Sequence, residues 1–288
     1  MSGRLPTSHT YFSQRLRLHY ADWGKSQAPA MLLVHGVQDH CHTWDWFAEA
    51  FVDDYHVLAP DLRGHGDSEW VRGSSYHPVD YVYDLDQLIR QRALAPLVIV
   101  SHSMGGTLAS IYAGVYPEQV RALVIIEGVG LWPGWSGPQR PEERIDTWIR
   151  GTRELAGRQP RRYPSLSEAG ARMRQANDRL SAVQADHLTR HGSHRNEDGT
   201  FSWKFDNYTH AGPAYRMPEA DLMALWRRIR CPVLLVNGGE GFAHRIGQDG
   251  TLGHFDDARV VDVPGAGHWV HHDCLEEVVV AVRGFLHG

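Results

Sequence analysis

A hexapeptide, Ser-His-Ser-Met-Gly-Gly at residues 101–106, constrains most strongly how this chain can fold. The apolar residues 96–100 before it are typical of a buried strand, and residues 107–114 after it follow a helical pattern. Ser103 therefore stands in a one-residue corner between a strand and a helix. Such a corner strains the backbone and exposes the hydroxyl. It also requires small neighbours, which Gly105 and Gly106 provide.

Three further motifs accompany this corner. A buried-strand run ends in His35-Gly36, residues 61–68 read Asp-Leu-Arg-Gly-His-Gly-Asp-Ser, and the turn Gly-Ala-Gly-His-Trp at 265–269 follows strand-like residues 259–263. In this order and with these gaps, the motifs resemble the serine α/β-hydrolase superfamily over residues 12–130 and 219–288. The corner departs from the superfamily's Gly-x-Ser-x-Gly pattern, because Ser101 replaces the first glycine. A serine side chain is small enough to fit there.

Buried strands alternate with helices from residue 31 to residue 126, which predicts a parallel sheet covered on both faces. Residues 14–24 alternate polar and apolar side chains, so we expect an edge strand there. The resemblance implies an α/β fold with a mostly parallel, doubly wound, eight-stranded sheet. We expect residues 1–130 and 219–288 to form this core domain.

Residues 131–218 lack apolar strand runs and resemble the helical cap, or lid, of the family. Their pattern predicts helices over 141–156, 166–176 and 181–191 and a short strand within 200–205. Ligands bind at the carboxyl edge of open α/β sheets, so we expect this insert to wall the substrate cavity. The insert carries the aromatic residues Trp132, Trp135, Trp148, Trp203, Tyr208 and Tyr215. We expect most of them to pack inside the insert and two or three, which the sequence does not single out, to face the cavity.

A serine hydroxyl needs a base within hydrogen-bond reach before it can act as a nucleophile at neutral pH. His268, in the turn after the last strand, matches the position of the family's catalytic histidine. The resemblance also implies an oxyanion hole formed by the backbone N–H groups of Val37 and Met104. We interpret residues 61–68 as a structural turn near the site.

The acid that should orient His268 is left open by the sequence. The family usually places an aspartate in a Gly-x-x-Asp pattern after the strand before the last, but Gly241 occupies that position. Glu240 lies one residue earlier. Glu127 ends the strand after the Ser103 unit, where some branches of the superfamily carry a relocated acid, and a buried carboxylate there is costly unless it is paired. We favour Glu127 over Glu240, and Asp256 or Asp257 remain further alternatives.

The leading hypothesis is a serine hydrolase that cleaves a small carboxylic ester through an acyl-enzyme. A carbon–carbon hydrolase of a vinylogous diketo acid would use the same triad, with insert arginines such as Arg150 and Arg153 as possible carboxylate ligands. A non-catalytic ligand-binding protein is the alternative from another class. Dehalogenase and epoxide hydrolase chemistry is disfavoured, because both need a carboxylate where Ser103 stands.

Composition narrows the partners of this 288-residue chain. With 42% hydrophobic residues and a net charge of −5, it has no electrostatic reason to bind nucleic acid or an anionic membrane. We expect only a small ester or acyl substrate as partner, and the oligomeric state stays open. Three scattered cysteines, a polar N-terminal segment and short apolar runs favour a cytoplasmic protein.

We expect neither a cofactor nor a metal. No dinucleotide or phosphate-loop motif occurs. The nineteen histidines include His187 and His191, four apart on a predicted helix, and the adjacent pair His271-His272. No acidic or thiol partner accompanies either pair at ligand spacing, so we interpret them as solvated or hydrogen-bonded histidines.

Overall fold

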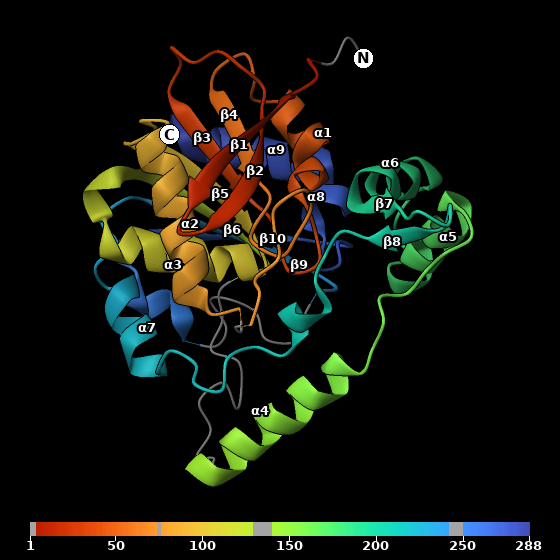
Figure 1. Cartoon of the computed structure of the whole chain (residues 1–288). Coiled ribbons are helices and arrows are strands. Elements are labelled where there is room, and N and C mark those ends of the chain that lie inside the picture. Colours follow the sequence, from red (N-terminus) through yellow and green to blue (C-terminus); the bar gives the residue numbers. More distant parts are fainter. Residues whose placement is uncertain (1–3, 74–75, 129–139, 242–249) are drawn as a thin grey trace.

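The computed structural model describes residues 4–73, 76–128, 140–241 and 250–288 (Figure 1). Its centre is an eight-stranded sheet with the strand order β1-β2-β4-β3-β5-β6-β9-β10. These strands are β1 (Thr7–Ser13), β2 (Leu16–Asp22), β3 (Ala30–Val34), β4 (His56–Pro60), β5 (Leu97–His102), β6 (Val120–Ile126), β9 (Val233–Gly238) and β10 (Ala258–Val263). β2 pairs antiparallel with β1 and β4, and every pair from β4 to β10 is parallel. The predicted eight-stranded, mostly parallel sheet is confirmed.

The N-terminal hairpin corrects one expectation. We expected a single edge strand over residues 14–24, but β2 lies inside the sheet and β1 forms its edge. Only Tyr11 and Ser13 of β1 are buried, so β1 lacks the regular apolar alternation that marks a strand in a sequence. The two strands are joined at Gln14, whose φ of 53° allows a tight turn.

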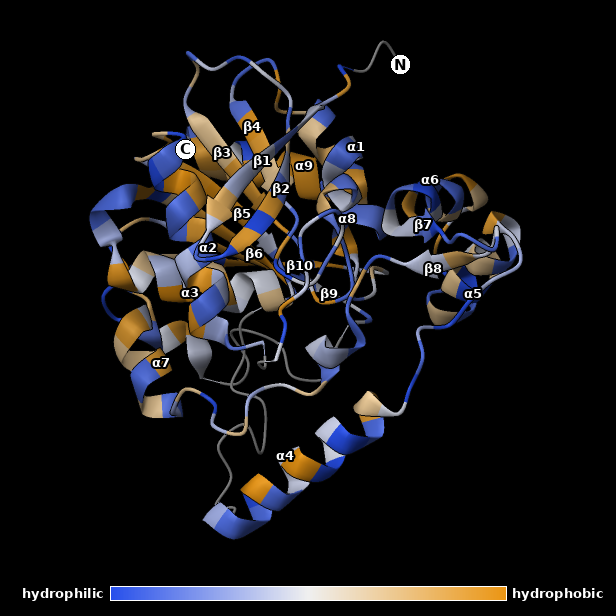
Figure 2. Cartoon of the chain, in the orientation of Figure 1, coloured by the Kyte–Doolittle hydropathy of each residue, from blue (hydrophilic) through white to orange (hydrophobic). Residues whose placement is uncertain are grey.

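Helices cover both faces of the sheet, and side chains of β5 show how the two faces are formed. Leu97 and Ile99 pack into the cluster beneath α2 (Pro78–Gln91), α3 (Met104–Val115) and α7 (Glu219–Trp226). Val98 and Val100 point to the opposite cluster, beneath α1 (Asp45–Glu49), α8 (Val270–Asp273) and α9 (Leu275–His287). Figure 2 shows hydrophobic residues concentrated in the central strands, whereas the covering helices alternate in hydropathy. In the described ranges, no helix has the length and apolar character needed to cross a membrane.

Between residues 140 and 218, the described chain adds no strand to the main sheet. It forms α4 (Pro141–Ala156), α5 (Leu166–Ala176), α6 (Ala182–Gly192) and a small hairpin of β7 (Ser193–Arg195) and β8 (Phe201–Trp203). The helices lie within one residue of their predicted positions, and α4 extends away from the main body in Figure 1. The expected start of the insert at residue 131, with Trp132 and Trp135, lies outside the described residues. The described residues also form four single 3-10 turns: η1 (Cys41–Trp44), η2 (Pro117–Gln119), η3 (Asn207–His210) and η4 (Thr251–His254).

Candidate active site

Ser103 lies in the turn between β5 and α3, at the carboxyl end of the parallel strands. Its backbone angles, φ 53° and ψ −122°, are strained for a residue with a side chain. The corner is held by two hydrogen bonds: the Ser103 N–H donates to the carbonyl of Ile126 at 3.0 Å, and the Gly106 N–H donates to the carbonyl of Ser103 at 2.9 Å. The structure therefore contains the sharp strand-to-helix turn that the hexapeptide predicts.

Close packing around this turn explains its small residues. A Cβ on Gly105 would lie 2.5 Å from the carbonyl oxygen of Val34, and one on Gly106 would lie 2.6 Å from Ile125. Ser101, which replaces the usual glycine, is fully buried, and its hydroxyl donates to the carbonyl of Val124 at 2.9 Å. The extra oxygen is thus satisfied by the neighbouring strand, and the departure from the pattern does not disturb the corner.

His268 lies in the turn between β10 and α8, with its Nε2 3.0 Å from the Ser103 Oγ. The serine hydroxyl donates to this nitrogen when the proton of the imidazole is on Nδ1. Two contacts fix the turn. The Nε2–H of His102 donates to the carbonyl of His268 at 2.9 Å, and the N–H of Gly267 donates to Asp273 at 2.7 Å. The residue before Ser103 therefore also positions the histidine.

Glu127 follows β6, the strand beside β5, and its buried carboxylate faces the same histidine. The His268 Nδ1–H donates to the Glu127 Oε2 at 3.4 Å, and the Gly238 N–H donates to Oε1 at 2.6 Å. Glu127 itself has a φ of 48°. A Cβ added to Gly241 would lie 2.5 Å from Oε2, so the carboxylate of Glu127 reaches the place beside the family's usual acid position.

The other candidate acids lie elsewhere. The side chain of Glu240 is 60% exposed and forms an ion pair with Arg179. Asp256 pairs with the exposed Arg230 at 2.7 Å, and the backbone carbonyl of Asp257 bonds to Val233 at the amino end of β9. That end of the sheet is opposite to the one that carries Ser103. Among these acids, the structure brings only Glu127 to the ring of His268.

Val37 and Met104, expected to supply the oxyanion hole, flank Ser103. Met104 is the first residue of α3, and Val37 follows Gly36, whose added Cβ would lie 3.1 Å from the Cβ of Ser103. The Nδ1–H of His35 donates to the carbonyl of Gly36 at 2.6 Å. That carbonyl and the Val37 N–H belong to one planar trans peptide, so His35 fixes the direction of the N–H as well.

The comparisons with known proteins are decisive about the family. The sequence model of the alpha/beta hydrolase family matches residues 31–282, which is most of the chain. The chain belongs to the alpha/beta hydrolase family. The predicted superfamily is thereby confirmed.

Relatives of this α/β hydrolase include esterases and lipases. It is 30% identical to esterase Rv0045c of Mycobacterium tuberculosis, over 92% of this chain and 84% of the relative. It is 29% identical to the sn-1-specific diacylglycerol lipase ABHD11 of Mus musculus, over 91% and 82% of the two chains. A thioesterase domain from the curacin biosynthetic pathway shares the fold, with a TM-score of 0.86, 23% identity, and coverage of 97% and 99%. Membership of a hydrolase family with esterase relatives supports hydrolase activity.

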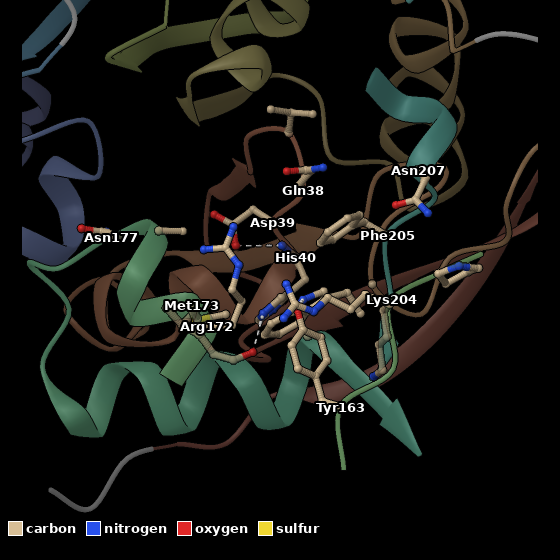
Figure 3. Close-up of a pocket in the computed structure, with 18 of the residues that line it drawn as sticks. Gln38, Asp39, His40, Tyr163, Arg172, Met173, Asn177, Lys204, Phe205 and Asn207 are labelled. Atoms are coloured by element: carbon tan, nitrogen blue, oxygen red, sulfur yellow. Dashed lines mark hydrogen bonds between the residues drawn. The ribbon is translucent and has the colours of Figure 1, made fainter. Parts of the chain in front are cut away.

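A pocket of about 600 Å³ opens beside the site of this α/β hydrolase (Figure 3). One wall comes from the core and includes Val37 and Trp269, the neighbours of Gly36 and His268. The opposite wall comes from the segment between residues 158 and 210 and includes Tyr163 and Trp203. Of the aromatic residues that the sequence nominated, Trp203 lines this pocket, whereas Trp148 and Tyr208 line an adjoining cavity that shares Arg158, Pro160 and Asn207 with it.

The sequence did not indicate the roles of three residues at the site. His102 and His35 brace the histidine turn and the Gly36 peptide, and Tyr163 lines the pocket. The adjacency of His102 to Ser103 is the single sequence signal that could have drawn attention to it. The contacts of His35 and Tyr163 depend on loops whose paths no local pattern predicts.

Buried neutral histidines are unusually numerous in this protein. Burial lowers the pKa of His35 to about 4, and the pKa values of His40, His65 and His272 to about 3. Burial also holds the pKa values of His102 and His271 well below the ordinary range. Each of these imidazoles is neutral in the folded protein at pH 5 and would gain a proton on unfolding.

We therefore expect stability to fall steeply on mild acidification. An unfolded histidine titrates near pH 6.5, so the contribution of each buried histidine is complete above that pH and is lost as the pH falls toward the folded pKa. Each adds a slope of about 1.4 kcal/mol per pH unit. Burial also raises the pKa of Asp39, to about 7, and that of Asp84, and these two carboxyls act in the opposite direction. They are outnumbered by the six histidines. Urea unfolding at pH 7, 6 and 5 measures the change in stability. Equal unfolding midpoints at pH 7 and pH 5 would contradict the expected loss of stability.

Proposed function

We propose that this protein is a serine hydrolase that cleaves a small carboxylic ester through an acyl-enzyme. The observation that carries the proposal is the continuous hydrogen-bonded path from the Ser103 hydroxyl through His268 to the buried carboxylate of Glu127. A nucleophile, a base and an orienting acid in this order are what acyl transfer requires. The esterase and lipase names of two relatives support the same reaction class.

In the proposed mechanism, Ser103 attacks the ester carbonyl while His268 Nε2 accepts the hydroxyl proton. Negative charge develops on the carbonyl oxygen, where the N–H groups of Val37 and Met104 would stabilise it. His268 then returns the proton to the departing alcohol, leaving an acyl group on Ser103. A water molecule, deprotonated by the same imidazole, releases the acid and restores the serine. Glu127 stabilises the imidazolium at each step.

Labelling with a fluorophosphonate probe tests this proposal directly, because only an activated serine reacts rapidly. We expect stoichiometric labelling at Ser103 and turnover of short p-nitrophenyl esters. A folded protein that neither labels nor hydrolyses any ester of the panel would instead support the non-catalytic, ligand-binding alternative.

We propose further that residues 131–218 act as a cap over the site. The support is the composition of the pocket, whose walls come partly from the core and partly from α5, α6 and the strand β8. Arg179 joins this segment to the core, because it pairs with Glu240 and donates to the carbonyl of Gly265 at 2.7 Å. The cap would thus shape the substrate while the reacting groups stay in the core.

Cationic side chains around the pocket favour substrates that carry a negative charge. Arg158, Arg161 and Arg172 line it together with Lys204, which also pairs with Asp67 at 2.8 Å. Figure 3 shows Arg172 and Lys204 among the labelled side chains of this pocket. Arg150 and Arg153, the cationic residues expected from the sequence, are not among its lining residues. We therefore propose an ester whose acyl part ends in an anionic group.

Arg172→Gln is expected to lower kcat/KM for an anionic substrate, p-nitrophenyl hemisuccinate, by roughly three- to fivefold, because a charge–charge contact made by an exposed arginine is worth up to about 1 kcal/mol. The same variant should hydrolyse neutral p-nitrophenyl butyrate within about twofold of the wild-type rate. Arg174→Gln, an exposed arginine on the same helix that does not line the pocket, is the matched control. Equal losses on both esters would contradict the assignment of charge selectivity to Arg172.

The cationic pocket equally suits the second candidate, hydrolysis of a carbon–carbon bond in a vinylogous diketo acid. Such a substrate carries a carboxylate and could use the same serine and histidine. Assaying a diketo acid beside the hemisuccinate separates the two candidates. Faster cleavage of the diketo acid would replace the ester proposal.

A further inference from the structure

A cluster of imidazoles around one carboxylate lies where the insert meets the core, outside the proposed triad. His42 belongs to η1 and Asp45 begins α1, whereas His187 and His191 come from α6. The sequence showed only the helical pair, without an acidic partner. Folding supplies that partner, because η1 and α1 of the core pack against α6 of the insert.

The four side chains are in mutual contact. His42 Nδ1 lies 3.0 Å and His187 Nε2 lies 2.9 Å from the same oxygen of Asp45. The rings of His42 and His191 are 3.8 Å apart between centroids. One ligand atom each from His42, Asp45 and His191 lies within 4.8 Å of the other two. All four residues are partly exposed, so an ion from solvent can reach them.

We propose that His42, Asp45 and His191 form a binding site for a divalent transition metal of the zinc class, with His187 holding the carboxylate as an outer partner. Imidazole and carboxylate ligands suit zinc, nickel, cobalt and copper. Ligand atoms of a tetrahedral zinc site are about 3.3 Å apart, given bond lengths of about 2.0–2.1 Å, so movements of roughly an ångström would close this site. Ligating carboxylates are commonly hydrogen-bonded to a further group, and His187 Nε2, 2.9 Å from Asp45, is close enough to take that part.

A metal ion at this site would link two parts of the structure. Its ligands come from the core on one side and from α6 on the other, and Leu188 and Gly192 of α6 line the pocket beside the candidate active site. A bound ion would fasten this wall of the pocket to the core. Because it would bind the folded chain in preference to the unfolded one, it would also raise the melting temperature.

Zinc titration of the full-length, untagged protein in chelator-treated buffer at pH 7.5 tests the proposal. We expect saturable uptake of one equivalent at this site, and a rise in Tm of roughly 3–5 °C at 100-fold excess over Kd. His191→Gln and His42→Gln should each weaken binding by at least about tenfold, and His187→Gln by about tenfold. His194→Gln, an exposed histidine on β7, is the matched control and should bind zinc as the wild type does.

Two further measurements serve as controls. The variant Asp45→Asn controls for misfolding, and the fluorescence of Trp46 distinguishes this site from other histidines that bind zinc. Asp45→Asn keeps the shape of the side chain but removes its charge, and it should also lose affinity. The ring of Trp46 is 4.6 Å from that of His187, so Ni²⁺ bound at this site should quench the fluorescence of Trp46. The Trp46→Phe variant should lose this part of the quenching. Zinc affinity that stays at the wild-type level in folded His42→Gln, Asp45→Asn and His191→Gln would overturn the proposal. Quenching of undiminished amplitude in Trp46→Phe would overturn it too.

Discussion

Ser103→Ala is expected to lower kcat for ester hydrolysis by at least about 10⁴-fold, because without the nucleophile only the oxyanion donors and substrate binding remain. The change removes a single oxygen at a partly exposed corner, so the fold and the melting temperature should be unaffected. Initial rates on p-nitrophenyl acetate, together with fluorophosphonate labelling, provide the measurement.

Ser101→Ala is the matched control for that variant. It removes the same atom two residues away, where the hydroxyl bonds to the carbonyl of Val124 and is fully buried. We expect a loss of less than about tenfold in kcat, with a modest loss of stability from the missing hydrogen bond. Activity of Ser103→Ala within tenfold of the wild type would exclude Ser103 as the nucleophile.

Glu127→Gln is expected to lower kcat by at least about a hundredfold, because an amide keeps the shape but cannot stabilise the imidazolium that forms at His268. Glu240→Gln should lose less than about tenfold, since its carboxylate pairs with Arg179. Parallel kcat measurements compare the two variants directly. The opposite ranking would assign the orienting role to Glu240.

Moving the carboxylate from residue 127 to residue 241 tests the same assignment of the orienting acid more sharply. Glu127→Gly removes the carboxylate and suits the φ of 48° at that position. Adding Gly241→Asp would place a new carboxylate beside the vacated space, because the Cβ of residue 241 would lie 2.5 Å from the former Oε2. We expect the double variant to recover at least about tenfold of the activity lost in Glu127→Gly. No recovery in a folded double variant would show that the β6 position alone can hold the acid.

The sheet and the corner at Ser103 could be predicted from the sequence because both depend on local signals. Apolar runs of five residues mark the parallel strands, and the glycines at 105 and 106 mark the close approach of strand and helix. The edge strand β1 was not predicted, because it lacks such a local signal. Most of its side chains are exposed, so no burial pattern is imposed on its residues.

The environment of His268 could be predicted only in part. The position of His268 relative to the motifs indicated a base. The choice of Glu127 or Glu240 as the orienting acid depended on which of the two side chains points toward His268. That direction follows from the positive φ of Glu127 and from its hydrogen bond to Gly238, neither of which leaves a sequence pattern. The cluster around Asp45 depends likewise on the docking of α6 against α1, a long-range contact between residues more than a hundred positions apart.

The space shared by Glu127 and residue 241 also restricts how such a protein can change during evolution. Two carboxylates at these positions would overlap sterically and repel each other, so a chain that gained the second acid before losing the first would pass through a damaged intermediate. We expect Gly241→Asp in the presence of Glu127 to be less stable and less active than either single-acid protein. Descendants of a common ancestor would then carry one acid or the other. Where the residue after β6 supplies the acid that orients His268, the sequence after β9 would no longer be constrained to keep one.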